Sequence, residues 1–208
     1  STTGKPDSTG SVGTAVEGAI KEVSELLDKL VTAVKTAEGA SSGTDAIGEV
    51  VDNDAKAADK ASVTGIAKGI KEIVEAAGGS EKLKAAAAKG ENSKGAGKLF
   101  GKAGADANGD SEAASKAAGA VSAVSGEQIL SAIVTAADAA EQDGEKPGDA
   151  KNPIAAAIGK GDGDADFGDG MKKDDQIAAA IALRGMAKDG KFAVKNDEKG
   201  KAEGAIKG

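Results

Sequence analysis

The chain has 208 residues and a formal net charge of −7, with no Cys, His, Trp or Tyr among them. These absences exclude disulfide bonds, zinc sites built on Cys or His, and catalytic triads that depend on histidine. An acidic chain also lacks the basic patch that nucleic-acid backbones require, so we expect no enzyme, no cofactor, no metal, no nucleic-acid partner and no small-molecule substrate.

The chain begins with a segment that is unable to pack. Residues 1–13 are rich in Ser, Thr and Gly, and we predict a polar N-terminal tether with no features of a signal peptide. Further along, no apolar stretch approaches the roughly 20 residues that a membrane-spanning helix needs. Leu, Ile, Val and Phe make up roughly 17% of the chain, below the level of about 20% under which disorder becomes a serious alternative.

Apolar periodicity nevertheless predicts ordered helices. In "VEGAIKEVSELLDKLVTAV" the apolar residues step by intervals of 3 and 4, which is typical of one face of an amphipathic helix. Residues 63–79 repeat the pattern, and Gly78 is placed to end that helix. The two predicted core stripes are Val16, Ile20, Val23, Leu27, Leu30 and Val34 in the first helix, and Val63, Ile66, Ile70 and Ile73 in the second.

Helix-capping signals mark the next elements. Ser125 and Gln128 have the spacing of a capping box, which predicts a helix whose core stripe is Ile129, Leu130, Ile133 and Val134. A shorter helix follows, because Asn152 is suited to cap it and Pro153 fits its first position. No run has the alternating pattern of a strand.

Residues 171–195 hold a large share of the rare side chains. This segment contains both Met residues, the only Arg and one of the three Phe. Asp174 and Asp175 suit the positive end of a helix. We predict a buried structural role for Ile177, Ile181, Met186, Phe192 and Val194, which fill gaps that Ala cannot fill. For Arg184, close to Lys188, a salt bridge or a solvated head is favoured over an anion contact.

Between the helices lie segments of Gly, Asp, Lys and Asn, near residues 39–60, 89–110, 143–151, 159–170 and 195–201. Their composition is typical of surface loops that tolerate replacement, although "LFGK" forms an apolar anchor in the second segment. Two acidic runs, which start at Asp106 and Asp162, begin like calcium loops. Neither has a carboxylate at the twelfth position, so solvated turns are favoured.

The amphipathic stripes need partners, because single helices of this length are marginally stable in water. We therefore predict an all-α fold, an irregular bundle of amphipathic helices joined by long polar loops, with residues 14–208 forming a single helical domain. Many Ala and Gly residues leave a thin core.

The chain resembles, over nearly its full length, the cassette region of the variable major protein-like surface lipoproteins of Lyme spirochaetes. The resemblance rests on "EGAIKEVSELLDKLV", "GIAKGIKEIVEAAGGSEKLKA", "GAGKLFGKAG", "GDSEAASKAAGAVSAVSGEQILSAIVTAADAAEQDG", "KNPIAAAIG" and "MKKDDQIAAAIALRGMAKDGKFAVK". The short direct repeats that flank the family's cassette look like the "EGAIK" copies at 17–21 and 203–207. The resemblance implies a cassette rewritten by gene conversion, with variable polar loops and invariant helices.

The same resemblance implies a location and partners. We expect a surface antigen on the extracellular face of the cell outer membrane, lipid-anchored upstream of Ser1, whose changing loops meet host antibodies. The residues of the 171–195 segment resemble the family's sixth invariable region, an antibody target that we expect to be covered in the native fold. The segment's candidate residues are Met171, Lys172, Lys173, Asp174, Asp175, Gln176, Ile177, Ile181, Arg184, Met186, Lys188, Asp189, Phe192, Val194 and Lys195.

Two alternatives remain open at the level of sequence. One is an adhesin, in which a fixed patch of the helical body binds a host molecule. The other is a disordered stress-protective protein, a class with similarly low aromatic content.

Overall fold

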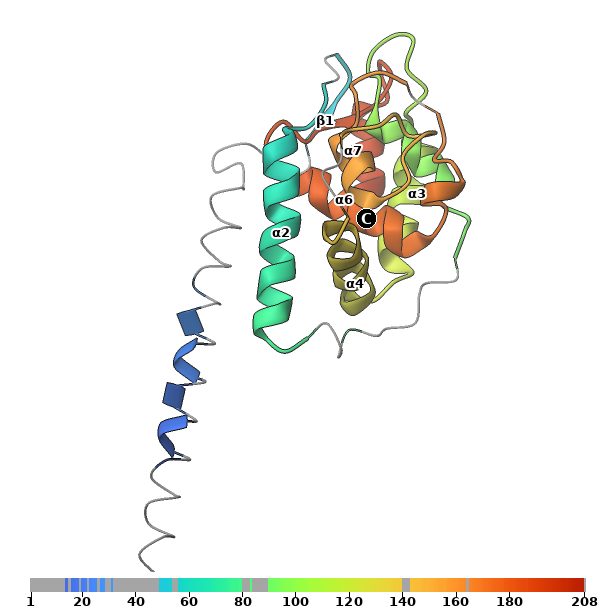
Figure 1. Ribbon diagram of the computed structural model, residues 1–208. Helices are drawn as coiled ribbons and strands as arrows, with labels where there is room; N and C mark the ends of the chain where they lie inside the picture. Colours follow the sequence, from blue (N-terminus) through green and yellow to red (C-terminus); the bar gives the residue numbers. More distant parts are fainter. Residues whose placement is uncertain are drawn as a thin grey trace, which may run out of the picture.

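The structure is a computed structural model that describes residues 49–53, 56–79, 83, 90–139, 143–163 and 165–207, together with residues 14, 16–18, 20, 21, 23–25, 27, 28 and 31. The predicted tether, residues 1–13, lies outside this set. The named elements are β1 (Val50–Val51), α2 (Lys60–Ala76), the 3-10 helix η1 (Lys94–Phe100), α3 (Ser111–Ser122), α4 (Gly126–Ala137), α5 (Pro153–Ile158), the 3-10 helix η2 (Asp169–Met171), α6 (Asp174–Met186), β2 (Phe192–Ala193) and α7 (Lys199–Lys207). The predicted irregular helical bundle is confirmed (Figure 1).

The second predicted helix, α2, begins and ends where local chemistry places its boundaries. The Asp59 carboxylate accepts a hydrogen bond from the backbone N–H of Ser62 at 2.8 Å, which satisfies one of the free donors of the first turn. Gly78 has a φ of +73°, a left-handed conformation that ends the helix at little cost for a residue without Cβ.

Capping also fixes the starts of α4 and α5. Ser125 Oγ accepts from the Gln128 backbone N–H at 3.2 Å, and Gln128 Oε1 accepts from the Ser125 N–H at 2.9 Å. This is the predicted capping box. The Asn152 side chain accepts from two backbone N–H groups of α5, both at 3.0 Å, and Pro153 occupies the first helical position.

Helix α6 lies at the centre of the fold and packs against α2, α3, α4 and α5 (Figure 1). Ile177 and Ala180 belong to one apolar cluster, which includes residues of η1, α3 and β2. Ala179 and Leu183 belong to a second cluster, which includes residues of α2, α4 and α5. The helix is therefore buried on two sides, and it joins the two halves of the core.

One feature was not predicted, a two-stranded parallel sheet formed by β1 and β2. Val50 pairs with Phe192 and Val51 with Ala193. The Phe192 N–H donates to the Glu49 carbonyl at 2.8 Å. The absence of strands in our prediction was wrong here, because a strand of two residues has no alternating pattern that a sequence could reveal.

The core stripes of α2 and α4 are largely, but not fully, buried. Val63, Ile66, Ile133 and Val134 are buried, and Ile70, Ile73 and Ile129 are half-buried. Leu130 is 36% exposed, so its prediction as a core residue was wrong. It lies about 100° around α4 from Ile129, at the edge of the stripe.

The first predicted helix forms where it is described, but its stripe is not buried in this chain. Val16, Ile20, Val23 and Leu27 are 52–64% exposed. The core prediction was wrong for these four residues, and Figure 1 shows this stretch in blue, apart from the other helices. Leu30 and Val34 lie outside the described residues.

Among the described residues, no single helix is long and apolar enough to cross a membrane. The pair α3 and α4 meets the length and composition criteria only when the two are taken together, and they are bent by 100° relative to one another.

Candidate functional site

Residues 171–195 lie mostly inside the fold, with only Lys173, Lys188 and Asp189 exposed. The candidate residues divide as follows: Met171, Asp174, Asp175, Ile177, Arg184, Phe192 and Val194 are buried, and Lys172, Gln176, Ile181, Met186 and Lys195 are half-buried. The segment supplies α6, β2 and their connection, so its cover comes from almost every other element of the bundle.

Asp174 and Asp175 lie at the start of α6, as predicted. Both are in the first turn, where free backbone N–H groups and the positive end of the helix dipole favour a carboxylate. The Asp175 carboxylate accepts from the backbone N–H of Gln176 at 2.9 Å. The Asp174 N–H donates to the Gly90 carbonyl at 3.0 Å, which joins α6 to the polar segment 89–110.

Arg184 is the most unusual side chain of the core, because it is 1% exposed and pairs with no carboxylate among the described residues. Its guanidinium donates instead to backbone carbonyls. Nε donates to Lys191 at 2.7 Å, Nη1 to Ala157 at 2.8 Å and Ile158 at 3.1 Å, and Nη2 to Lys56 at 3.1 Å. The expectation of a salt bridge or a solvated head was wrong. The planar fork of Arg satisfies carbonyls of three chain segments at once.

Burial lowers the pKa of Arg184 to about 10 because water no longer solvates the cation. That pKa still lies well above neutral pH, so the guanidinium remains charged. The carbonyl oxygens and the ring of Phe100 therefore face a positive charge, and each contact is stronger than it would be with a neutral donor.

The polar segment 89–110 contributes to the core through the apolar anchor predicted at "LFGK". Within η1, Leu99 and Phe100 are almost completely buried. The Phe100 ring lies 5.0 Å from that of Phe167 and 5.7 Å from that of Phe192, the latter at an edge-on angle of 82°. All three Phe residues of the chain thus meet in one cluster. The expectation of a plain surface loop was wrong at Phe167, in segment 159–170.

Sequence reasoning missed Phe167, although a signal was present. Large side chains are rare in this chain, and their rarity was taken as a sign of burial only within residues 171–195. The same reasoning applied to every Phe would also have identified Phe167, which lies in "DADFGDG".

The segments 89–110 and 159–170 approach each other backbone to backbone. The Phe167 N–H donates to the Lys94 carbonyl at 2.8 Å, and the Lys102 N–H to the Gly163 carbonyl at 3.1 Å. A Cβ at Gly97 would lie 2.5 Å from the Phe167 nitrogen, and a Cβ at Gly101 would collide with the Gly163 carbonyl. Glycine is therefore required at these two positions because no side chain fits between the two backbones.

Ion pairs cross the outer side of the same junction. Lys94 Nζ lies 2.8 Å from Asp169 Oδ1, and Lys98 Nζ lies 3.6 Å from Asp166 Oδ1. The hydrogen bond with Lys94 lowers the pKa of Asp169, and the reciprocal bond raises the pKa of Lys94. These side chains are solvent-exposed, so their contribution to stability is small and falls with salt.

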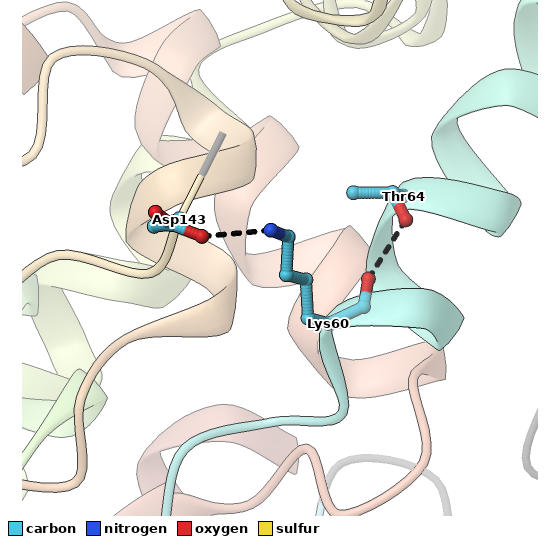
Figure 2. Close-up of polar contacts among 3 residues, drawn as sticks. All are labelled: Lys60, Thr64 and Asp143. Atoms are coloured by element: carbon cyan, nitrogen blue, oxygen red, sulfur yellow. Dashed lines mark hydrogen bonds and ion pairs between the residues drawn. The ribbon is translucent and has the colours of Figure 1, made fainter. Parts of the chain in front are cut away.

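Segment 143–151 is tied to the start of α2 in a similar way. The Lys60 ammonium lies 2.7 Å from the Asp143 carboxylate, and the Thr64 hydroxyl donates to the Lys60 carbonyl at 2.8 Å; Figure 2 shows both contacts. The hydrogen bond from Lys60 lowers the pKa of Asp143. An open cavity of about 670 Å³ lies over this segment, with Asp143, Glu145, Asp149 and Lys151 in its lining.

The acidic runs are used for structure. Asp110 caps α3 by accepting from the Ala113 N–H at 2.9 Å, and Asp162 lies 3.4 Å from Lys146. Among the described residues, which do not include Asp164, no group of three or more acidic side chains is arranged to hold a metal ion.

Taken together, the geometry offers a buried apolar scaffold and a polar outer surface made by segments that touch one another. In the described part of the chain, no group of three or more acidic side chains is placed to hold a metal ion.

The chain is similar in sequence to several known Borrelia proteins and in fold to a crystallised one. The chain is 87% identical to the crystallised Lyme disease variable surface antigen VlsE of Borrelia burgdorferi, with a TM-score of 0.90, over 94% of this chain and 67% of that one. It is 43% identical to variable large protein 17 of Borrelia hermsii over 88% of this chain and 53% of the relative. It is 40% identical to variable large protein 4 of the same organism over 86% of this chain and 52% of the relative.

The chain thus spans about half the length of these two curated relatives. The family described as Borrelia lipoprotein matches residues 2–208. Because this match covers nearly the whole sequence, the chain belongs to the Borrelia lipoprotein family.

Proposed function

We propose that this chain is the variable portion of an antigenically variable surface lipoprotein, in which a helical scaffold displays exchangeable polar segments to host antibodies. No substrate is turned over. The observation that carries the proposal is the division between a buried apolar scaffold, centred on α6, and an outer surface built from segments 89–110, 143–151 and 159–170.

The similarity to a variable surface antigen supports the same proposal. Gene conversion between the two "EGAIK" copies would rewrite the residues between 17–21 and 203–207. The second copy lies in α7, and the described residues of the first are helical. Both borders of the exchanged region would then be short helical pieces that any recombinant retains.

We also propose a location for this chain, which its family supports. The family description and the relatives favour a lipoprotein on the extracellular face of the outer membrane, anchored through a lipid upstream of Ser1. Protease treatment of intact cells tests the location, since a surface protein is cleaved while a periplasmic control protein survives.

We propose that segment 171–195 is an epitope that the native fold covers. Its burial supports the idea that antibodies against it need unfolded, shed or degraded antigen, because a paratope reaches few of its side chains in the native fold. We expect antibodies to this segment to bind denatured protein strongly and intact cells weakly. Equal binding to both would contradict the burial argument.

A serum experiment tests antigenic display. One variant changes exposed residues of segment 89–110, Asn92, Asp106 and Asn108, and leaves η1 unchanged. A matched control changes three exposed residues of α3, Glu112, Ser115 and Lys116. Serum raised against the native parent should lose more binding to the first variant than to the control. Equal losses would contradict a display role for the segment.

The two alternatives from the sequence are less well supported. The helical fold, which matches a crystallised relative, excludes a disordered stress-protective protein. An adhesin needs a patch that stays constant, and the polar cavity of about 670 Å³ does not supply one, because it is lined mainly by residues of segment 143–151, which we expect to be exchanged.

A further inference from the structure

A second cavity, of about 330 Å³, lies between η1, α3, α6 and β2. Its apolar lining consists of Leu99 from η1, Ala117, Ala118 and Val121 from α3, Ile181 from α6 and Phe192 from β2. Ser122 supplies the single polar side chain of the lining, and no charged side chain is part of it. The cavity is separate from the polar surface described above.

The mouth of this cavity carries an exposed apolar side chain. Among the large apolar residues between 49 and 205 whose exposure the structure describes, Val121 at 40% and Leu130 at 36% are the exposed ones. The rest are buried or half-buried, so the exposure of Val121 beside an apolar cavity is unusual for this fold. Exposed apolar surface at a hollow is typical of a ligand-binding site.

The walls of the cavity are fixed by the core. Leu99 is 1% exposed, and the Phe192 ring packs edge-on against Phe100. The backbone of Phe192 is held by its hydrogen bond to Glu49. The cavity therefore exists before any ligand arrives, and binding does not require the core to reorganise.

The rim selects against a negatively charged head group. Ser122 is the last residue of α3 and α4 begins at Gly126, so the negative end of one helix dipole lies close to the positive end of the other and neither sign dominates. No Lys or Arg lines the cavity to neutralise a carboxylate. A hydroxyl group suits the rim better, because it donates to a carbonyl and exchanges a hydrogen bond with Ser122.

Size sets the length of the ligand. An apolar cavity of about 150 Å³ accepts a benzene molecule, so a cavity about twice as large holds on the order of twelve carbon atoms. We propose that this cavity binds the single hydrocarbon chain of an uncharged lipid, with its hydroxyl head group at Ser122. The occupant is therefore a medium-chain monoacylglycerol and not a fatty-acid anion.

Titration of the full chain with monolauroylglycerol, below its aggregation concentration, tests the proposal. The readout is the methyl signals of Leu99, Val121 and Ile181 in nuclear magnetic resonance spectra. We expect saturable binding of one lipid per chain, with shifts at these methyl groups, and at least tenfold weaker binding of laurate. Shifts that grow without saturation, or equal affinity for laurate, would overturn the proposal.

Variants distinguish specific binding in the cavity from nonspecific adsorption of lipid to the surface. Ala118→Phe fills the cavity and should weaken binding at least tenfold, whereas Ser115→Phe places the same ring on the exposed side of α3 and should leave binding unchanged. Ser122→Ala, at an exposed position, keeps the test valid if Ala118→Phe does not fold. This variant should bind monolauroylglycerol several-fold more weakly than the parent and bind dodecane with unchanged affinity. Equal binding by Ser122→Ala and the parent would contradict the assigned head-group position.

Discussion

The guanidinium carbon of Arg184 lies 5.7 Å from the centroid of the Phe100 ring, with both side chains buried. Arg184 belongs to the segment expected to stay constant, and Phe100 belongs to a polar segment expected to change. The contact shows that the scaffold and the displayed surface share one core. A segment that is exchanged for another must therefore still supply a ring, or an equivalent apolar group, at position 100.

Arg184→Met should destabilise the fold by about 3 kcal/mol, because it leaves backbone carbonyls of three segments buried without a donor. Urea unfolding followed by circular dichroism measures this. Antibodies against 171–195 should also gain access to the folded variant. Lys188→Met, at an exposed position of the same segment, serves as the control and should change neither property.

Phe100→Ala should cost about 3–5 kcal/mol, since it removes a fully buried ring from the aromatic cluster. Asn92→Ala, in the same polar segment but exposed, should stay within about 0.5 kcal/mol of the parent. Thermal unfolding of the two variants side by side makes the comparison. If both lost little stability, segment 89–110 would be a plain surface loop after all.

The same substitution should have opposite effects at two glycines. Gly101→Ala should destabilise by about 2 kcal/mol or more, because its Cβ meets the Gly163 carbonyl and the two backbones must separate. Gly119→Ala, inside α3 with no atom within 4 Å of the new Cβ, should stabilise by about 0.5–1 kcal/mol. The unfolding midpoints in urea show whether each substitution stabilises or destabilises the chain. A stable Gly101→Ala protein would argue against the close approach of segments 89–110 and 159–170.

The ion pair of Figure 2 should appear in an acid titration. Lys60 lowers the pKa of Asp143 below its ordinary value of 3.8, so the pair's small stabilisation is complete above pH 3.8 and is lost as pH falls through the lowered pKa. Carboxyl nuclear magnetic resonance signals report this midpoint. Lys60→Met should raise it toward 3.8, whereas Lys68→Met, at an exposed position of the same helix, should leave it in place.

Leu27→Ala should change the stability of this chain by no more than about 0.5 kcal/mol, because Leu27 is 55% exposed. Val63→Ala, fully buried in α2, should cost about 2 kcal/mol. Differential scanning calorimetry of both variants measures the contrast. A large loss for Leu27→Ala would mean that the first stripe does pack in solution.

Features that depend on residues close together in the chain, such as the starts of helices, could be predicted from the sequence. Ser125 with Gln128, and Asn152 with Pro153, carry the starts of α4 and α5 in adjacent residues, so no knowledge of the remaining fold was needed. The stripe of α2 was equally accessible, since helical periodicity alone identifies Val63 and Ile66 as core residues.

The prediction failed where a residue's role depends on distant parts of the chain. An exposed salt bridge is the ordinary state of an Arg, and only the tertiary fold brings the carbonyls of residues 56, 157, 158 and 191 around Arg184. Helical periodicity likewise predicts that Ile20 needs an apolar surface to pack against, but it does not predict whether this chain provides that surface. The burial of Phe167 was hidden by the polar composition around it.

The parallel pairing of β1 with β2 has a consequence for how sequence change is absorbed. Its hydrogen bonds run between main-chain atoms, from Phe192 to Glu49 and from Val194 to Val51. Such bonds do not involve the side chains, so most substitutions leave them intact. Proline at a donor position is the exception, because it has no N–H. Under the proposed exchange, the exposed positions beside this strand could therefore change while the pairing is kept, whereas Val50 and Val51 are themselves buried and have to stay apolar.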